Sequence, residues 1–81
     1  MTTIATTTDV RLRRYRLVPV TDRRWRVTDA AGRVIGHVDR TGDPHTPRYR
    51  ARRFRVSMGG FLELGEFWHL EDAVAVLHDS R

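Results

Sequence analysis

The most distinctive spacing in this chain belongs to arginines that recur at every second position. Residues 48–55 read RYRARRFR, in which five of eight side chains are Arg and none is acidic. Every second side chain of a β-strand points to the same face, about 6.6–7 Å apart. Guanidinium groups at that spacing can contact successive phosphates, and each contact releases counterions bound to a polyanion. Arg can also form paired hydrogen bonds to guanine in the major groove.

The same pattern recurs in residues 24–28, where Arg24 and Arg26 alternate with Trp25 and Val27. If both stretches are strands of one sheet, their arginines form a basic face, and further arginines lie near the ends of the intervening hairpin. The arginines that we expect to contact a polyanion are Arg24, Arg26, Arg33, Arg48, Arg50, Arg52, Arg53 and Arg55.

Charge is divided unevenly along the 81-residue chain, whose fifteen basic residues are all Arg and whose net charge is +5. Residues 11–55 contain fourteen Arg and four Asp, a net charge of +10, whereas residues 56–81 have a net charge of −4. Such asymmetry indicates a polyanionic partner. The alternative is a solvated face that only keeps the protein soluble, but a face with that role alone would mix both signs of charge.

Residues that could perform catalysis or bind a metal are present, but their spacing suits neither task. Ser57 and Ser80 do not lie in the turn that exposes a nucleophilic serine. The four His lack the spacing of a helical zinc site, and no Cys is present to complete one. Glu63 and Glu66 are three positions apart on an expected strand, hence on opposite faces, where they cannot act as a pair. We therefore expect no catalytic residue, no cofactor and no metal.

Alternation of apolar with polar residues predicts five strands separated by turns and one longer loop. Residues 29–32, DAAG, read as a tight turn, because Asp can accept bonds from the backbone ahead of it and Gly can adopt a positive φ. Pro19 fits an edge strand or a strand terminus. Residues 41–47 contain two Pro and one Gly, which predicts a loop. The expected strands are residues 14–20, 24–28, 33–39, 48–55 and 61–67.

One helix is expected near the C-terminal end of the chain. Leu70, Ala73, Val74 and Leu77 fall on one helical face. Acidic residues in the first turn complement the helix dipole, although no Ser, Thr, Asp or Asn is placed to cap the start. The acidic surface of this helix would be repelled by phosphates. We therefore expect the helix to brace the back of the sheet and leave recognition to the strands.

A chain of this length has a thin core, so large apolar residues are expected to fill it. Aromatic residues could instead be stacking platforms for single-stranded bases, and this alternative stays open for Phe61 and Trp68. The doubled Arg52-Arg53 interrupts the alternation, which predicts a bulge or a strand end there. The expected core consists of Trp25, Phe54, Phe67, Leu70, Val74 and Leu77.

These elements predict a single small α+β domain over residues 11–81, with a disordered tail over residues 1–10. Its fold class is an antiparallel sheet of four to five strands with one C-terminal helix packed on one face. The chain has no Cys, no signal-peptide pattern and no apolar run of the ~18–20 residues needed to span a membrane. We therefore expect a cytoplasmic protein.

Residues 64–80, LGEFWHLEDAVAVLHDS, resemble the ending of the AP2-type and arm-type integrase DNA-binding domains. Those domains end in a strand with Leu-Gly-x-Phe, a short turn, and a helix with an acidic start and Ala on its inner face. Leu64, Gly65, Phe67, Glu71 and Ala73 match that order. The resemblance implies a sheet that lies in the DNA major groove, braced by the helix, with the arginines of residues 24–26 and 48–52 as contacts.

The sequence thus favours a small nucleic-acid-binding accessory protein, with DNA preferred over RNA, that uses an arginine-rich sheet face. The alternative is a protein-interaction module that binds an acidic partner or forms a homodimer through an open sheet edge. No membrane contact, no cofactor and no small-molecule substrate are expected.

Overall fold

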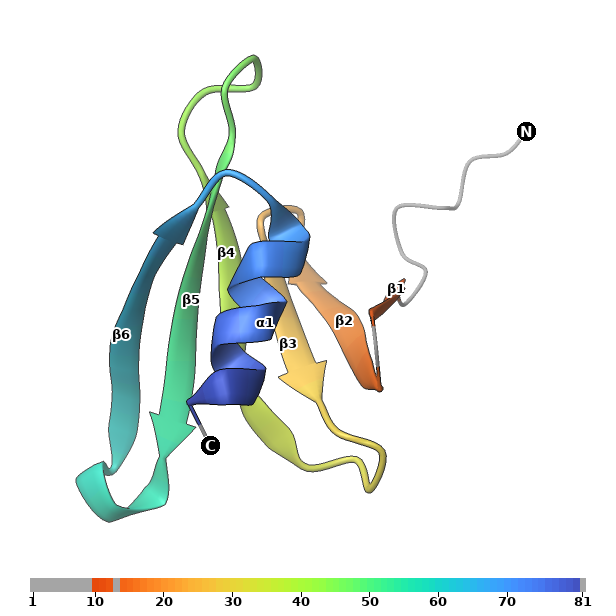
Figure 1. The fold of residues 1–81 in the computed structure, drawn as a ribbon, viewed down its shortest axis with the longest axis vertical. Helices are drawn as coiled ribbons and strands as arrows, with labels where there is room; N and C mark the ends of the chain where they lie inside the picture. Colours follow the sequence, from red (N-terminus) through yellow and green to blue (C-terminus); the bar gives the residue numbers. More distant parts are fainter. Residues whose placement is uncertain (1–9, 13, 81) are drawn as a thin grey trace.

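The computed structural model describes residues 10–12 and 14–80, which form one antiparallel sheet and one α-helix (Figure 1). The sheet is a meander, because its strands are neighbours in the same order as in the sequence. The strands and the helix, together with the 3₁₀ turn η2, are β1 (Val10–Leu12), β2 (Tyr15–Thr21), β3 (Arg24–Thr28), β4 (Val34–Thr41), β5 (Arg48–Arg55), η2 (Val56–Met58), β6 (Gly60–Phe67) and α1 (Leu70–Asp79).

The predicted α+β class is confirmed, with five strands of five or more residues and the three-residue β1 at one edge. The tail predicted over residues 1–10 lies outside the described residues, apart from Val10 in β1. Strand β1 pairs with β2 only at residues 15–17, so Pro19 is paired with β3 alone and lies beyond the part of β2 that pairs with β1. This matches the expectation for a proline, which cannot donate a ladder hydrogen bond.

The turn between β3 and β4 is held by Asp29. One carboxylate oxygen of Asp29 accepts hydrogen bonds of 2.9 Å from the backbone N–H groups of Ala31 and Arg33. Gly32 follows with φ of 85°, a conformation that favours glycine. The Asp and the Gly therefore play the roles that the sequence predicts.

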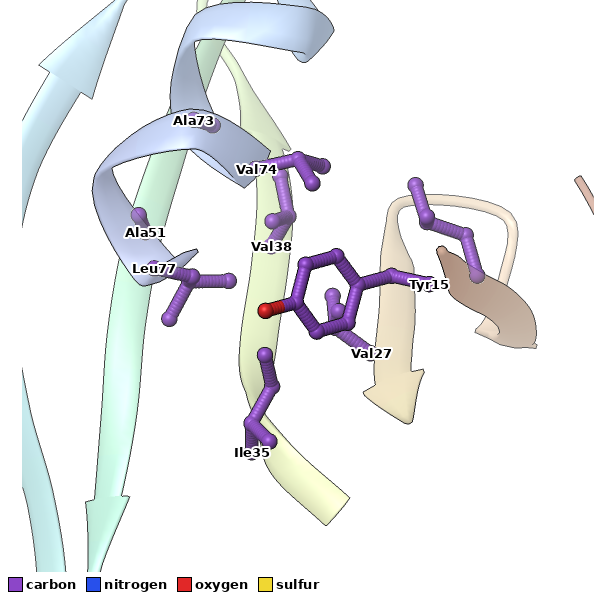
Figure 2. Packing of buried hydrophobic residues seen from close by; sticks show 9 residues of the cluster. Tyr15, Val27, Ile35, Val38, Ala51, Ala73, Val74 and Leu77 are labelled. Atoms are coloured by element: carbon purple, nitrogen blue, oxygen red, sulfur yellow. The ribbon is translucent and has the colours of Figure 1, made fainter. Parts of the chain in front are cut away.

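Helix α1 covers one face of the sheet and contacts β4, β5 and β6 (Figure 1). The described core lies between them and extends to β2 and β3 (Figure 2). Tyr15 brings a polar group to this core, and its hydroxyl shares a hydrogen bond of 2.6 Å with Nδ1 of His78 near the end of α1. The buried residues of the core are Tyr15, Leu17, Val27, Ile35, Val38, Ala51, Ala73, Val74 and Leu77.

The predicted core is partly right. Val74 and Leu77 are buried, and the other predicted residues except Phe54 are half-buried against the cluster. The assignment of Phe54 to the core is wrong, since this residue is 38% exposed. Strand β5 continues without interruption to Arg55, and its side chains keep alternating through the doubled arginines. Phe54 therefore points to the face opposite α1, while Arg53 points toward the helix.

Bulges interrupt the pairing at three places, and one of them lies between Ala51 and Arg52 of β5, although its extra residue belongs to β6 and not to the doubled arginines. Each adds one residue to one strand: Val20 in β2, Ile35 in β4 and Leu64 in β6. Ile35 joins the buried core, and Leu64 packs against it. The last two bulges thus supply an extra apolar side chain to the helix-covered face.

Gly36 lies at a position where α1 and strand β5 both pack closely against β4. A Cβ atom on Gly36 would lie 2.2 Å from the carbonyl oxygen of Arg52 and 2.8 Å from Cδ2 of Leu77. Glycine at this position allows the strands and the helix to pack closely. The described part of the chain contains no helix long and apolar enough to cross a membrane.

Replacing Gly36 with Ala is expected to destabilise the fold by about 1–3 kcal/mol, because the added methyl group overlaps backbone that cannot move freely. The free energy of unfolding in urea measures this change. Gly60→Ala is the matched control, since a Cβ on Gly60 would meet nothing within 4 Å. Equal stability of the two variants would contradict the close approach.

Candidate functional site

The face of the sheet opposite α1 is covered by no described element, and we call it the open face. Residues directly opposite in the strand register share a face of the sheet. Arg24 of β3 is opposite Asp39 of β4, and Asp39 is opposite Arg50 of β5, so these three side chains lie on the same face. The prediction that the alternating arginines of residues 24–26 and 48–52 share one face is confirmed. Charged residues at open-face positions of β2–β6 are Arg16, Arg24, Arg26, Asp39, Arg48, Arg50, Arg52, Glu63 and Glu66.

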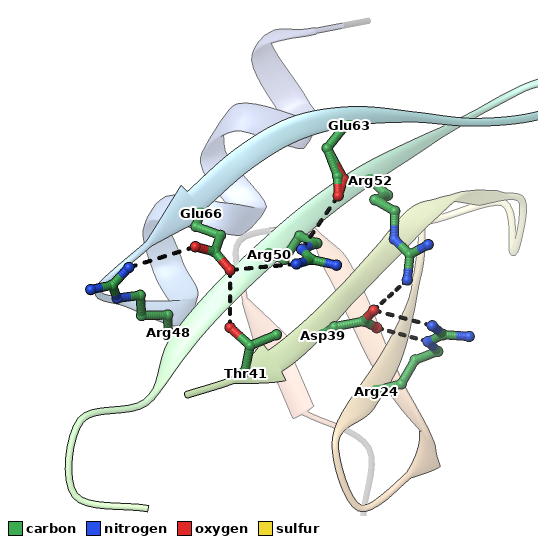
Figure 3. A network of polar contacts seen from close by, with 8 residues as sticks. All are labelled: Arg24, Asp39, Thr41, Arg48, Arg50, Arg52, Glu63 and Glu66. Carbon is green, nitrogen blue, oxygen red and sulfur yellow. Dashed lines mark hydrogen bonds and ion pairs between the residues drawn. The ribbon is translucent and has the colours of Figure 1, made fainter. Parts of the chain in front are cut away.

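Asp39 lies at the centre of this face and bridges two arginines (Figure 3). Arg24 donates two hydrogen bonds to the carboxylate, from Nε at 2.7 Å and from Nη2 at 3.1 Å. Nη2 of Arg52 donates to the same carboxylate from the other side. Burial alone would raise the pKa of Asp39, but the hydrogen bonds and positive charges of Arg24 and Arg52 outweigh it and lower that pKa.

A second group of ion pairs joins β5 to β6 (Figure 3). Arg50 lies between two carboxylates, with Nε 3.3 Å from Oε2 of Glu63 and Nη2 3.7 Å from Oε2 of Glu66. Arg48 lies 3.7 Å from Oε1 of Glu66, and its Cζ lies 4.7 Å from the ring centre of Trp68. The acid-free row of arginines in the sequence is therefore partly neutralised by acids from neighbouring strands.

The bulge in β6 makes this arrangement possible and corrects an expectation. Glu63 and Glu66, three positions apart, were expected on opposite faces. The extra residue at Leu64 shifts the alternation, so Glu63 pairs opposite Arg52 and Glu66 opposite Arg50. Both carboxylates therefore lie on the open face, where they contact Arg50 rather than each other.

The open face remains positive after these pairs are counted. Its six arginines and three carboxylates give a net charge of +3. Arg26 is exposed and makes no ion pair or hydrogen bond with the described residues. A hollow next to this face, where β2 meets the β3–β4 turn, is lined partly by Arg14 and Arg16. The positive charge is therefore concentrated toward β2 and β3.

Three aromatic rings lie at the end of the open face near η2, and we call them the aromatic cluster: His37, Phe54 and Phe61. The rings of His37 and Phe61 stack with centres 4.7 Å apart and an angle of 23°. The centres of the Phe54 and Phe61 rings are 5.4 Å apart. Burial lowers the pKa of His37, and the positive charges of Arg24 and Arg26 lower it further. His37 is therefore neutral at neutral pH.

The remaining predicted site residues lie elsewhere. Arg53 points toward α1, where Nη1 donates to the carbonyl oxygen of Leu77 at 3.1 Å and to Oγ of Ser80 at 3.4 Å. Its charge lies at the negative end of the helix dipole. Arg33 lies in the β3–β4 turn beside Asp29, and Arg55 is exposed at the end of β5. These three arginines are not grouped with the open face.

Metal ligands do not gather in the part of the chain that the structure describes, where no group of three or more His, Cys, Asp or Glu is placed to hold an ion. His37, one of the four histidines that lack zinc-site spacing, lies in register with Arg26 on one side and Arg52 on the other. Period-two alternation from Asp39 could have placed it on the open face.

Asp39→Asn is expected to destabilise the protein by about 1–3 kcal/mol at pH 7, because two arginines lose their shared counterion. The lowered pKa of Asp39 also sets a pH dependence. The unfolded chain binds its proton near the ordinary value of 3.8 and the folded chain only at lower pH. The stabilisation is therefore complete above about pH 5 and is lost as pH falls below about 4. Urea denaturation from pH 7 to pH 3 should show the difference between wild type and variant shrinking below pH 4; a constant difference would contradict this assignment.

Arg53→Met is expected to lower the free energy of unfolding by about 1–2 kcal/mol, because α1 loses a charged donor at its C-terminal end. Arg55→Met, which removes an exposed charge two positions away, should change it by less than about 0.5 kcal/mol. Urea denaturation of both variants measures the contrast. Equal effects would show that the contact with Leu77 contributes nothing.

Comparison with models of protein families, with curated proteins and with solved structures found no match for the chain. The resemblance to the AP2-type and arm-type integrase domains is therefore supported only in its coarse outline. The structure shares with them an antiparallel sheet followed by a C-terminal helix, with six strands in place of their three.

Proposed function

We propose that this chain is a nucleic-acid-binding accessory protein, with DNA preferred over RNA, that contacts its partner through the open face and performs no catalysis. The observation that carries the proposal is the collection of six arginines on one uncovered sheet face with a net charge of +3. A face with this charge attracts phosphates and gains affinity from the release of counterions.

The ion pairs of the open face are compatible with phosphate contacts. A guanidinium has five N–H donors in a planar fork. Asp39 occupies two donors of Arg24 and one of Arg52, and Nε of Arg52 is buried, so the remaining donors of the two guanidinium groups are left for a ligand. Carboxylates that hold arginines in fixed orientations reduce the entropy lost when those arginines bind a phosphate.

The charge of α1 favours one orientation on the partner. Glu71, Asp72 and Asp79 are exposed on the helix, on the other side of the sheet from the open face. Phosphates repel this side and attract the open face. The partner is therefore expected to lie against the strands, with the helix turned away.

Binding to a labelled random duplex should weaken steeply between about 50 and 300 mM salt, with a slope of about 0.9 per phosphate contact. Arg26→Glu should weaken binding at low salt by roughly tenfold or more and reduce the slope, because it reverses an exposed charge that no acid of the described residues neutralises. Glu66→Gln should strengthen binding, because it removes one negative charge from the open face, while Glu63 still holds Arg50 in place. Fluorescence anisotropy measures both changes.

Arg55→Glu is the matched control, since it changes the net charge equally at the end of β5 without altering the open face. If Arg55→Glu weakens binding as much as Arg26→Glu, the attraction is unlocalised and the open face is not the site. Failure of the wild type to bind any duplex or single strand at the lowest salt would refute the proposed function.

A protein-interaction role is the second candidate, and the exposed edge of the sheet favours it. Strand β6 pairs with β5 alone in the described structure. Large apolar side chains are exposed just before and just after β6 in the sequence: Val56 is 80% exposed, Met58 59% and Trp68 61%. An open edge of this kind can pair with another chain. A dimer on a sizing column that persists at high salt and after nuclease treatment would favour this candidate.

A further inference from the structure

The aromatic cluster places apolar rings where a solvated sheet face would carry polar side chains. Phe54 is 38% exposed and Phe61 39% exposed. Both lie on the open face, across the sheet from the core that α1 covers. These two rings therefore do not belong to the described core, and their exposed surface is available to a ligand.

Arginines flank this cluster on the side of β3 and β5. His37 lies directly opposite Arg26 on β3 and directly opposite Arg52 on β5. The His37 ring in turn stacks on Phe61. Arg26, which pairs with no described acid, thus lies on the strand next to His37 of the aromatic cluster. This is the combination of phosphate-binding and base-stacking groups that single-stranded nucleic acids need.

We propose that the open face binds unpaired nucleotides, with a base stacked on Phe54 and Phe61 and its phosphate held by Arg26. This inference rests on the proposed function and specifies its substrate class. The bases of a duplex are stacked on one another, so their ring faces cannot reach a protein side chain without being flipped out. A single strand offers every base to the rings.

The charge of the surroundings distinguishes this ligand from an apolar protein segment. The cluster is bordered by Arg26 and by Arg52, which is held by Asp39, and the open face as a whole is positive. An apolar peptide would bury the guanidinium group of Arg26 without supplying a counterion, which costs free energy. A single-stranded nucleic acid supplies ring faces from its bases and negative charge from its phosphates.

The test compares three labelled probes of equal length at the same low salt: oligo-dT, an abasic deoxyribose-phosphate strand, and a random duplex. Oligo-dT should bind most tightly, by roughly 5- to 150-fold over the abasic strand, the range that one base–aromatic stack contributes. Phe54→Leu with Phe61→Leu should reduce oligo-dT affinity by a similar factor while leaving abasic-strand affinity within about twofold. A parallel titration with oligo-rU distinguishes RNA from DNA as the source of the strand.

The control is Met58→Ala, which removes an exposed apolar side chain from η2, outside the open face. Urea denaturation checks that the variants remain folded, and the comparison of oligo-dT with the abasic strand needs no variant at all. Equal affinity of wild type for oligo-dT and the abasic strand, or tighter binding to the duplex, would overturn the single-strand inference and leave the proposed function standing. No binding to any of the probes would overturn the proposed function itself.

Discussion

The absence of a side chain at Gly36 allows Leu77 of α1 to pack closely on the face of the sheet that the helix covers. Any side chain at Gly36 would collide with the backbone of Arg52 and with Leu77. Because the chain is short, one helix can bury only one face, and the described core is concentrated beneath it (Figure 2). The opposite face must then be solvated or bind a partner, and its residues set what the protein can contact.

Pairing between strands turns the basic residues of that face into an ordered network. Asp39 joins Arg24 to Arg52, while Glu63 and Glu66 hold Arg50 (Figure 3). These acids relieve the repulsion that a bare row of arginines would create, and they still leave the face positive. The same contacts orient the guanidinium groups. Stability and the proposed phosphate binding therefore depend on the same side chains.

The aromatic residues divide between the two faces for a similar reason. Tyr15 and Leu17 face the helix because they alternate in step with Val27 across the β2–β3 pair. Phe54 follows the alternation of β5 and faces away from the helix. Its exposure cannot be judged from hydrophobicity alone, since a phenylalanine is usually a core residue. It becomes informative only because Phe61 and His37 lie beside it.

The sequence by itself determined the five longer strands, the helix and the grouping of the alternating arginines, because alternation and helical periodicity are local consequences of backbone geometry. It did not determine β1. It correctly indicated the turn at Asp29 and the helix that begins at Leu70. It placed Arg53 in the wrong group, because the doubled arginines were taken for a break in β5. Tertiary structure alone decided the ion pairs of the open face. Asp39 and Arg52 are distant in the sequence and meet only because of the register between β4 and β5. It also decided that Glu63 and Glu66 share a face, because the bulge at Leu64 forms where an extra apolar residue can pack against the core.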